Sequence, residues 1–111
     1  MQHRDYIVIK KIIDEIEICI SLLGDSGQED FRRNEMCKRA VCMTVINIGE
    51  LVKNLTMDAR KEYSDIPWKE IAGFRDITAH RYQTLNIDDV YVTVKDEFPS
   101  ILNNLKAIIE N

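Results

Sequence analysis

Glycine and proline are scarce in this sequence of 111 residues, which contains four glycines and two prolines. Because these residues mark turns and loops, their scarcity argues against a loop-rich or disordered chain. Charged residues interrupt every apolar stretch after a few positions, so no segment is predicted to span a membrane. A composition of 45% hydrophobic and 31% charged residues is typical of a globular protein. The length predicts one domain over residues 1–111, without room for a second.

Cysteine is also too scarce for a disulfide framework, since the chain has three in no framework spacing. An odd number of cysteines is more typical of a reducing cytoplasm, where we expect this protein to act. Cys37 and Cys42 lack the spacing of a zinc site, and His3 and His80 are isolated. No glycine-rich nucleotide motif is present either. We therefore expect no metal and no cofactor.

The charge balance excludes a broad nucleic-acid-binding face. The formal net charge is −4, which disfavours association with a polyanion by bulk attraction. The segment RRNEMCKR at 32–39 contains four basic residues, but they are spread around a predicted helix and indicate a solvated face. Any contact with nucleic acid is therefore expected to be local. The four-residue apolar run near the N-terminus is too short for a signal peptide.

Apolar residues recur at three- and four-residue spacing in two long segments, which predicts amphipathic helices over residues 4–23 and 30–54. The intervening GDSGQED contains two glycines and breaks the chain. MDARKEY predicts a short helical turn. The positions expected on the inner faces of these two helices are Ile9, Ile12, Ile13, Ile16, Cys19, Ile20, Leu23, Cys37, Ala40, Val41, Thr44, Val45, Ile48, Leu51, Val52 and Leu55.

Two further helices are expected in the second half of the chain. Pro67 suits the first turn of a third helix, which we expect to end near YQTLN. Asn86, with Asp89 three residues later, resembles a helix cap and opens a last helix to about residue 109. Pro99 lies inside this last helix and should kink it. The fold class predicted is all-α, an up-down bundle of four main helices and one short helix.

A second stripe follows another face of the helix predicted over 30–54. It consists of Met36, Met43, Ile46, Asn47 and Glu50 and is only partly polar. One interpretation is scattered apolar residues on the surface, which are common. The other is a contact surface for a second copy or another protein. The sequence leaves both open.

The segment FRDITAHRY at 74–82 has an unusual arginine. On a helix, Arg75 falls near the middle of the apolar stripe that contains Trp68 and Tyr82. A guanidinium in such a setting needs an acceptor or an anionic ligand. The simplest interpretation is an ion pair with Glu50 or Asp76.

Arg75 and His80 together supply the two kinds of side chain that phosphodiester chemistry needs. Histidine transfers protons near neutral pH, and arginine stabilises charge on phosphoryl oxygens. On a straight helix, however, His80 would lie about 140° from Arg75, and Tyr82 about 20° from it. Either the helix loosens before His80, or two copies share the site across a two-fold axis.

These residues resemble a known family. Arg75-x4-His80-x-Tyr82 is similar to the Arg-x4-His-x-Tyr signature of the HepT-like branch of HEPN proteins. INIGELVKNL, YSDIPWKEIAGFRDITAH and VKDEFPSIL resemble other parts of the same family. The resemblance covers nearly all of residues 36–105. It implies an all-helical, HEPN-like, homodimeric fold. It also implies a metal-independent ribonuclease, the toxin paired with an MntA-like nucleotidyltransferase antitoxin.

The resemblance also implies roles for individual residues. Arg75 would bind the phosphate of RNA and stabilise the transition state, and His80 would transfer protons. Tyr82 would accept AMP from the nucleotidyltransferase, which silences the nuclease. Asp76 occupies a position that is a polar amide or acid in much of the family, and with Glu50 it would support the site. The alternative is a helical binding module without catalysis, which docks on a nucleotidyltransferase.

Overall fold

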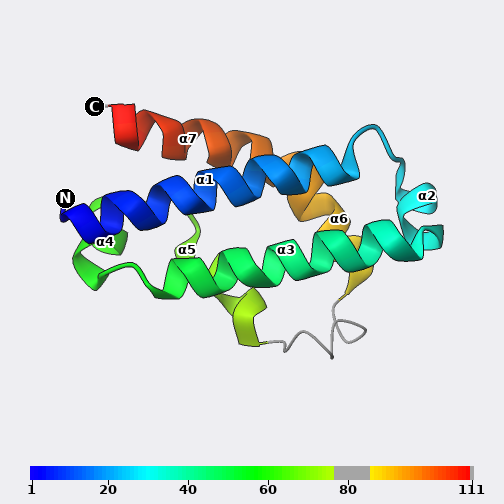
Figure 1. The fold of residues 1–111 in the computed structure, drawn as a ribbon, viewed down its shortest axis with the longest axis horizontal. Coiled ribbons are helices and arrows are strands. Elements are labelled where there is room, and N and C mark those ends of the chain that lie inside the picture. The colour runs from blue at the N-terminus through cyan, green and yellow to red at the C-terminus, as the bar shows by residue number, and fades with distance from the viewer. Residues whose placement is uncertain (77–85, 111) are drawn as a thin grey trace.

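The computed structural model describes residues 1–76 and 86–110, and every element within these ranges is helical (Figure 1). The prediction of an all-α protein is confirmed. In chain order the elements are α1 (His3–Leu23), α2 (Gln28–Arg33), α3 (Glu35–Lys53), α4 (Met57–Glu62), α5 (Trp68–Ala72), the 3₁₀ turn η1 (Gly73–Asp76), α6 (Ile87–Val92), the π-helical turn η3 (Thr93–Glu97) and α7 (Phe98–Glu110).

The long helices α1, α3 and α7 form the body of the bundle. α1 and α3 run antiparallel, and α7 packs on the other side of α1 (Figure 1). The molecule is elongated, with principal extents of 42 × 26 × 19 Å. Within the described ranges, three helices exceed ten residues, and the third helix predicted from the sequence extends into residues 77–85, which lie outside the described residues. No helix in the described part of the chain is both long and apolar enough to cross a membrane.

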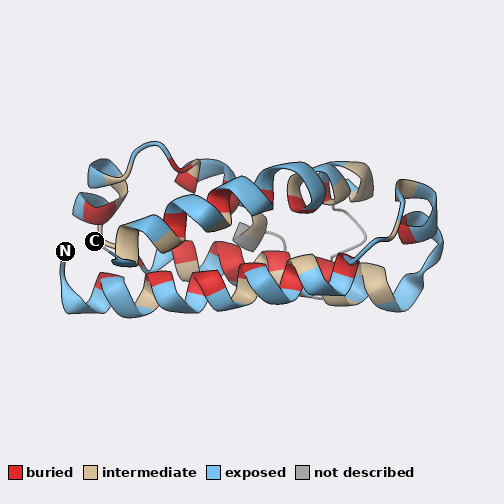
Figure 2. Ribbon diagram, turned by 90° about the horizontal axis from the view of Figure 1, so that it is seen from above, coloured by how far each residue is buried: buried red, intermediate tan, exposed pale blue. Residues whose placement is uncertain are grey.

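The core lies between the facing stripes of these helices, where buried positions recur along each inner face (Figure 2). The predicted apolar face of α1 is confirmed: its members at 9, 12, 13, 16, 19 and 23 are buried, and Ile20 is partly buried against the core. The fully enclosed large side chains are Phe31, Phe98, Ile9, Ile12, Ile16, Ile48, Leu105, Val41, Val45, Val52, Val90 and Val94.

The helix predicted over 30–54 is in fact two helices, which meet at Asn34. The Asn34 backbone is extended, with φ −94° and ψ 96°, and its side-chain oxygen accepts a hydrogen bond from the Cys37 amide at 3.0 Å. Asparagine is among the best N-cap residues because its side chain satisfies an amide that the helix leaves unpaired. α2 can therefore turn away from α3, and Phe31 enters the core with no exposed surface.

Pro99 has the effect predicted for it. Proline has no amide to donate, and its ring clashes with the carbonyl four residues earlier. The chain accommodates this by widening into η3 directly before α7, where the Phe98 amide donates to the Thr93 carbonyl oxygen. The last helical region is therefore divided into α6, η3 and α7.

The second stripe of α3 is partly open to solvent. Met36 and Met43 are 83% and 44% exposed, while Ile46 is half-buried. Asn47 donates a hydrogen bond to the Glu15 carboxylate of α1. The stripe is therefore most apolar towards the N-terminal half of α3.

One carboxylate, Asp5, is buried where α1 meets the start of α4. Its two oxygens accept hydrogen bonds from the Thr56 amide at 2.9 Å and the Thr56 hydroxyl at 2.7 Å. Thr56 in turn caps α4 through the Ala59 amide at 3.1 Å. Asp5 is 1% exposed and Thr56 is half-buried, so loss of the Asp5 carboxylate removes both hydrogen bonds that fix the start of α4.

We expect Asp5→Ala to lower the free energy of unfolding by about 1.5–3 kcal/mol, the typical contribution of a hydrogen bond to a charged group. Urea denaturation monitored by circular dichroism measures this. Asp14→Ala, at an exposed position of the same helix, is the matched control and should change stability by less than about 0.5 kcal/mol. Equal effects for the two variants would contradict a specific role for Asp5.

Candidate active site

The segment that leads to the Arg-x4-His-x-Tyr motif begins at α5, whose inner face is buried. Trp68, Ile71 and Ala72 are 5%, 3% and 4% exposed, as their helical spacing predicts. The Trp68 indole Nε1 donates a hydrogen bond to the Tyr63 carbonyl oxygen at 3.0 Å. Pro67 lies directly ahead of α5 as its N-cap residue, one position earlier than predicted. α5 is therefore firmly anchored in the core.

The α-helix ends at Ala72, and the chain continues as η1, which contains Arg75 and Asp76. The predicted third helix therefore changes from α-helix to 3₁₀ turn at Gly73, and its predicted end near YQTLN lies outside the described residues. The change occurs at Gly73, and glycine is the poorest helix former after proline. A 3₁₀ turn advances about 120° per residue rather than about 100°. Arg75 itself therefore lies in a 3₁₀ turn, not in the straight α-helix from which the angles were calculated.

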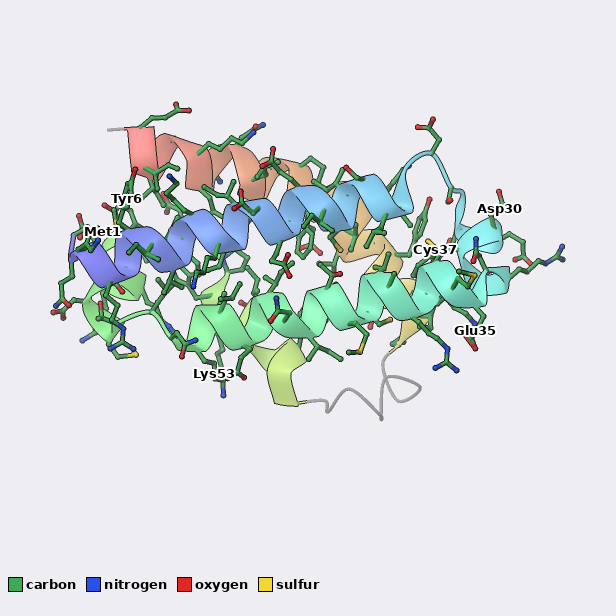
Figure 3. All side chains as sticks on the ribbon, viewed as in Figure 1. Met1, Tyr6, Asp30, Glu35, Cys37 and Lys53 are labelled. Carbon is green, nitrogen blue, oxygen red and sulfur yellow. The ribbon has the colours of Figure 1, made fainter. Side chains whose placement is uncertain are left out.

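η1 packs closely against α3, on the side opposite α1 (Figure 1). Gly49 is buried in α3 and shares a helix face with Lys53, whose side chain lies on the η1 side of α3 in Figure 3. Glycine inside a helix costs about 1 kcal/mol relative to alanine, and it permits a close approach of backbones. Sequence reasoning missed Gly49, although a glycine within a long amphipathic pattern was a usable signal.

Only part of the predicted site lies within the described residues. His80 and Tyr82 lie outside the described residues, and for Arg75 and Asp76 the described feature is the backbone of η1. Glu50 is exposed on α3, the helix on which η1 packs. An ion pair of Arg75 with Glu50 or Asp76 stays a prediction. So does the joint action of Arg75 and His80 on one phosphate.

Beyond the motif, the chain re-enters the described structure at Asn86, which caps α6. The Asn86 side-chain oxygen accepts hydrogen bonds from the amides of Asp88 and Asp89 at 3.1 and 3.2 Å. The cap predicted from the sequence is confirmed. Two acidic residues in the first turn also interact favourably with the partial positive charge at the N-terminus of a helix. The carboxyl end of the motif segment is therefore attached to a well-defined helix start.

A bidentate ion pair holds this helix start against α2. Arg32 Nε lies 2.8 Å from Asp88 Oδ1, and Arg32 Nη2 lies 3.0 Å from Asp88 Oδ2. Arg32 Nη1 also contacts Glu29 Oε2 at 3.1 Å. The hydrogen bonds from Arg32 hold the pKa of the Asp88 carboxyl below its usual value. Those from Asp88 and Glu29 raise the pKa of Arg32.

Sequence reasoning did not find the pair of Arg32 with Asp88, because 56 positions separate the two residues. The neighbouring basic residues fit the solvated face that was predicted. Arg33 pairs with Glu29 at 3.0 Å within α2, and Lys38 pairs with Glu35 at 3.7 Å within α3. Such exposed pairs contribute little to stability.

A hollow of about 280 Å³ lies beside the start of α6. It is lined by Arg32, Lys38, Asn86, Ile87 and Asp88.

Within the ranges that the structure describes, no group of three or more histidine, cysteine, aspartate or glutamate side chains is placed to bind a metal ion. Cys19, Cys37 and Cys42 are free thiols. Burial raises the pKa of Cys42 to about 11.

Comparison with known proteins places this arrangement in a family. The family model described as Ribonuclease HepT-like matches residues 12–108. "Putative RNase TTE0752" of Caldanaerobacter subterraneus subsp. tengcongensis is 34% identical over 92% of this chain and 91% of its own length. "Probable ribonuclease HepT" of Thermococcus cleftensis is 31% identical over 96% of this chain and 94% of its own.

"Putative RNase MJ0125" of Methanocaldococcus jannaschii is 35% identical over 90% of this chain and 86% of its own length. No solved structure matches the chain. The family match contains the whole Arg75-x4-His80-x-Tyr82 motif, together with the helices that precede and follow it. The chain therefore belongs to the HepT-like ribonuclease family.

Proposed function

We propose that this protein is a metal-independent endoribonuclease and the toxin of a toxin–antitoxin pair. The family match over residues 12–108, which includes the Arg75-x4-His80-x-Tyr82 motif, is the observation that carries the proposal. The packing of η1 on α3 supports it, because this contact anchors the backbone of Arg75 on one of the two long helices at the centre of the bundle. A rigid base is what an active site requires of its scaffold.

In the proposed reaction RNA supplies its own nucleophile. The 2′ oxygen bonds to the adjacent phosphorus while the bond from phosphorus to the 5′ oxygen breaks. The 2′-hydroxyl loses a proton and the leaving 5′ oxygen gains one, and His80 is the group that transfers protons. Arg75 binds the phosphate and offsets the charge that builds on its oxygens. Asp76 and Glu50 support the position of Arg75.

The proposed partner is an MntA-like nucleotidyltransferase that acts as the antitoxin in the cytoplasm. It would transfer AMP from ATP to Tyr82: the tyrosine oxygen loses its proton and bonds to the α-phosphorus, while the bond to the β-phosphate breaks and pyrophosphate leaves. The added phosphate carries negative charge and would compete with RNA for Arg75. Tyr82 belongs to the same motif as Arg75 and follows it by seven positions, so that competition is sterically reasonable.

The direct test is cleavage of RNA by the purified protein in EDTA. The proposal expects cleavage, because none of its steps needs a metal ion. Binding of the nucleotidyltransferase without any cleavage of a broad set of RNAs would instead favour a non-catalytic docking module. A small nucleotidyltransferase reading frame beside the gene would support the pair.

We further propose that the protein is a two-fold dimer whose copies meet over the stripe of α3. Met43 is 44% exposed there and Met36 is 83% exposed, and burial of apolar surface is the main driving force for association. A two-fold axis near the motif would place both copies of Arg75 and His80 close together.

Sedimentation at micromolar concentration is expected to show a dimer, and Met43→Glu to shift it towards monomer. Ile18→Glu is the matched control, since Ile18 is 48% exposed on α1 and lies outside the stripe. A monomeric wild-type protein would rule out the dimer. Loss of the dimer in the Ile18 variant alone would place the interface on α1 instead.

A further inference from the structure

Gly49 is buried in α3 although it has no side chain. When a helical residue without a Cβ is buried, a neighbouring element covers the backbone of the helix itself. Glycine is the poorest helix former after proline, so a packing requirement explains its presence in α3 better than helix formation does. The element that lies over Gly49 therefore shows what this glycine permits.

That element lies on the side of α3 away from α1. Asn47, which donates to the Glu15 carboxylate of α1, is two positions from Gly49 and therefore about 160° away around the helix. Lys53 follows Gly49 by four positions and shares its face. The Lys53 side chain projects on the η1 side of α3 in Figure 3. Gly49 therefore faces η1, which packs on that side of α3.

η1 comes closer to α3 than α5 does. Its four residues, Gly73–Asp76, approach the Cα atoms of α3 more closely than the five residues of α5. Side chains at a helix contact normally hold the two axes about 8–10 Å apart, and a residue without a Cβ allows a second backbone to come nearer. Arg75 is the third residue of η1. The contact with Gly49 therefore fixes the backbone that carries Arg75.

The glycine on the other side of this contact has no such role. Gly73 has φ −59° and ψ −26°, which any residue adopts. A Cβ added there would meet no atom of the described residues within 4 Å. Space is therefore required on α3 and not at the first residue of η1. Alanine at position 49 would place a methyl group between the two backbones and move η1 outward.

We propose that Gly49 is a positioning residue for the ribonuclease site. It leaves α3 without a side chain where η1 packs, and it thereby sets how far from the bundle the Arg75 side chain begins. This inference rests on the proposed function, in which the Arg75 guanidinium binds the phosphate of RNA. Gly49 acts through the backbone of η1 and does not touch the RNA.

The first test compares Gly49→Ala with Gly27→Ala in the 111-residue protein. Gly27 is the N-cap residue of α2, and a Cβ added there would meet no described atom within 4 Å. Gly49→Ala should lower kcat for RNA cleavage about tenfold, because small displacements of catalytic groups have effects of this order or larger. KM should rise less than about threefold, since Arg75 matters most where charge builds on the phosphate. Gly27→Ala should keep both constants within about twofold of wild type.

Equal effects of the two substitutions would overturn the proposal, because they would reflect the exchange of glycine for alanine alone. A higher KM at unchanged kcat would also overturn it, because Gly49 would then affect only the binding of RNA. Unchanged constants in Gly49→Ala would show that η1 does not need the space.

Two further measurements separate a positioning role from a merely structural one. Under single-turnover conditions, the double variant Gly49→Ala/Arg75→Ala should be no slower than Arg75→Ala alone, because Gly49 acts only through Arg75. Multiplied losses would overturn the proposal. Circular dichroism of Gly49→Ala should match that of the wild type. An unfolded variant would overturn the proposal as well, because Gly49 would then be required by the fold and not by the site.

Hydrogen–deuterium exchange of peptides from residues 68–76 tests the packing of η1 without RNA. Exchange should be faster in Gly49→Ala and unchanged in Gly27→Ala, because looser packing raises the frequency of local opening. Identical exchange in the two variants would overturn the proposal. Absence of cleavage by the wild-type protein would instead count against the proposed function, so the two failures are distinguishable.

Discussion

Replacement of His80 by alanine is expected to abolish RNA cleavage and toxicity while the protein stays folded. Proton transfer by a positioned side chain accelerates a reaction about 10²–10⁴-fold. The variant should therefore cleave RNA at about 10⁻² to 10⁻⁴ of the wild-type rate, or more slowly. The described core draws on side chains of α1, α2, α3, α5, α6 and α7, all of which are unchanged in this variant, so circular dichroism should be unchanged. Cleavage of a labelled RNA in EDTA measures the loss.

His3→Ala is the control for this experiment, because His3 is the other histidine of the chain and is exposed at the start of α1. It should retain wild-type cleavage. The single variant Arg75→Ala should also lose activity, because the substitution removes the guanidinium that stabilises the transition state. Full activity in both the Arg75 and His80 variants, at native stability, would show that the catalytic assignment is wrong.

Tyr82→Phe is expected to keep most of the ribonuclease activity and yet escape silencing by the nucleotidyltransferase. The hydroxyl is not the proposed proton carrier, so its removal should leave cleavage within a few-fold of wild type. Without the hydroxyl, AMP has no attachment site. Mass spectrometry of protein co-expressed with the partner should show AMP-sized additions on wild type and none on the variant.

Tyr6→Phe is the matched control, because Tyr6 is 36% exposed and is also accessible to modification. It should still be modified and silenced. Additions that map to Tyr63 or Tyr91 would contradict the assignment of Tyr82. A Tyr82→Phe protein that the partner still silences, without binding it stably, would contradict it as well.

The straight-helix angle between Arg75 and Tyr82 stays a prediction, because Arg75 lies in the 3₁₀ turn η1 and Tyr82 lies outside the described residues. The prediction for Tyr82 rests on the Arg-x4-His-x-Tyr motif and on the family match. The same limit applies to the predicted angle between Arg75 and His80. A pattern of apolar residues indicates which face of a helix is buried, but it does not indicate where packing converts an α-helix into a 3₁₀ turn.

Sequence reasoning succeeded where the information is local. The three- and four-residue spacing gave α1 almost to the residue, from the predicted 4–23 to the observed His3–Leu23. The Asn86 cap and the effect of Pro99 were correctly predicted too, because each depends on one side chain and the backbone within a turn of it. Asn34 is the local signal that was overlooked, and its cap divides the second long helix.

The sequence by itself thus determined the all-α class, the long amphipathic helices and, through the motif, the family. Only the tertiary structure decided how the ends of the motif segment are held. η1 packs on α3, and Arg32 pairs with Asp88 across 56 positions. Asp5 likewise meets Thr56 across 51 positions. The physical reason is that periodicity and capping are properties of neighbouring residues, whereas these pairs exist only after the helices have packed.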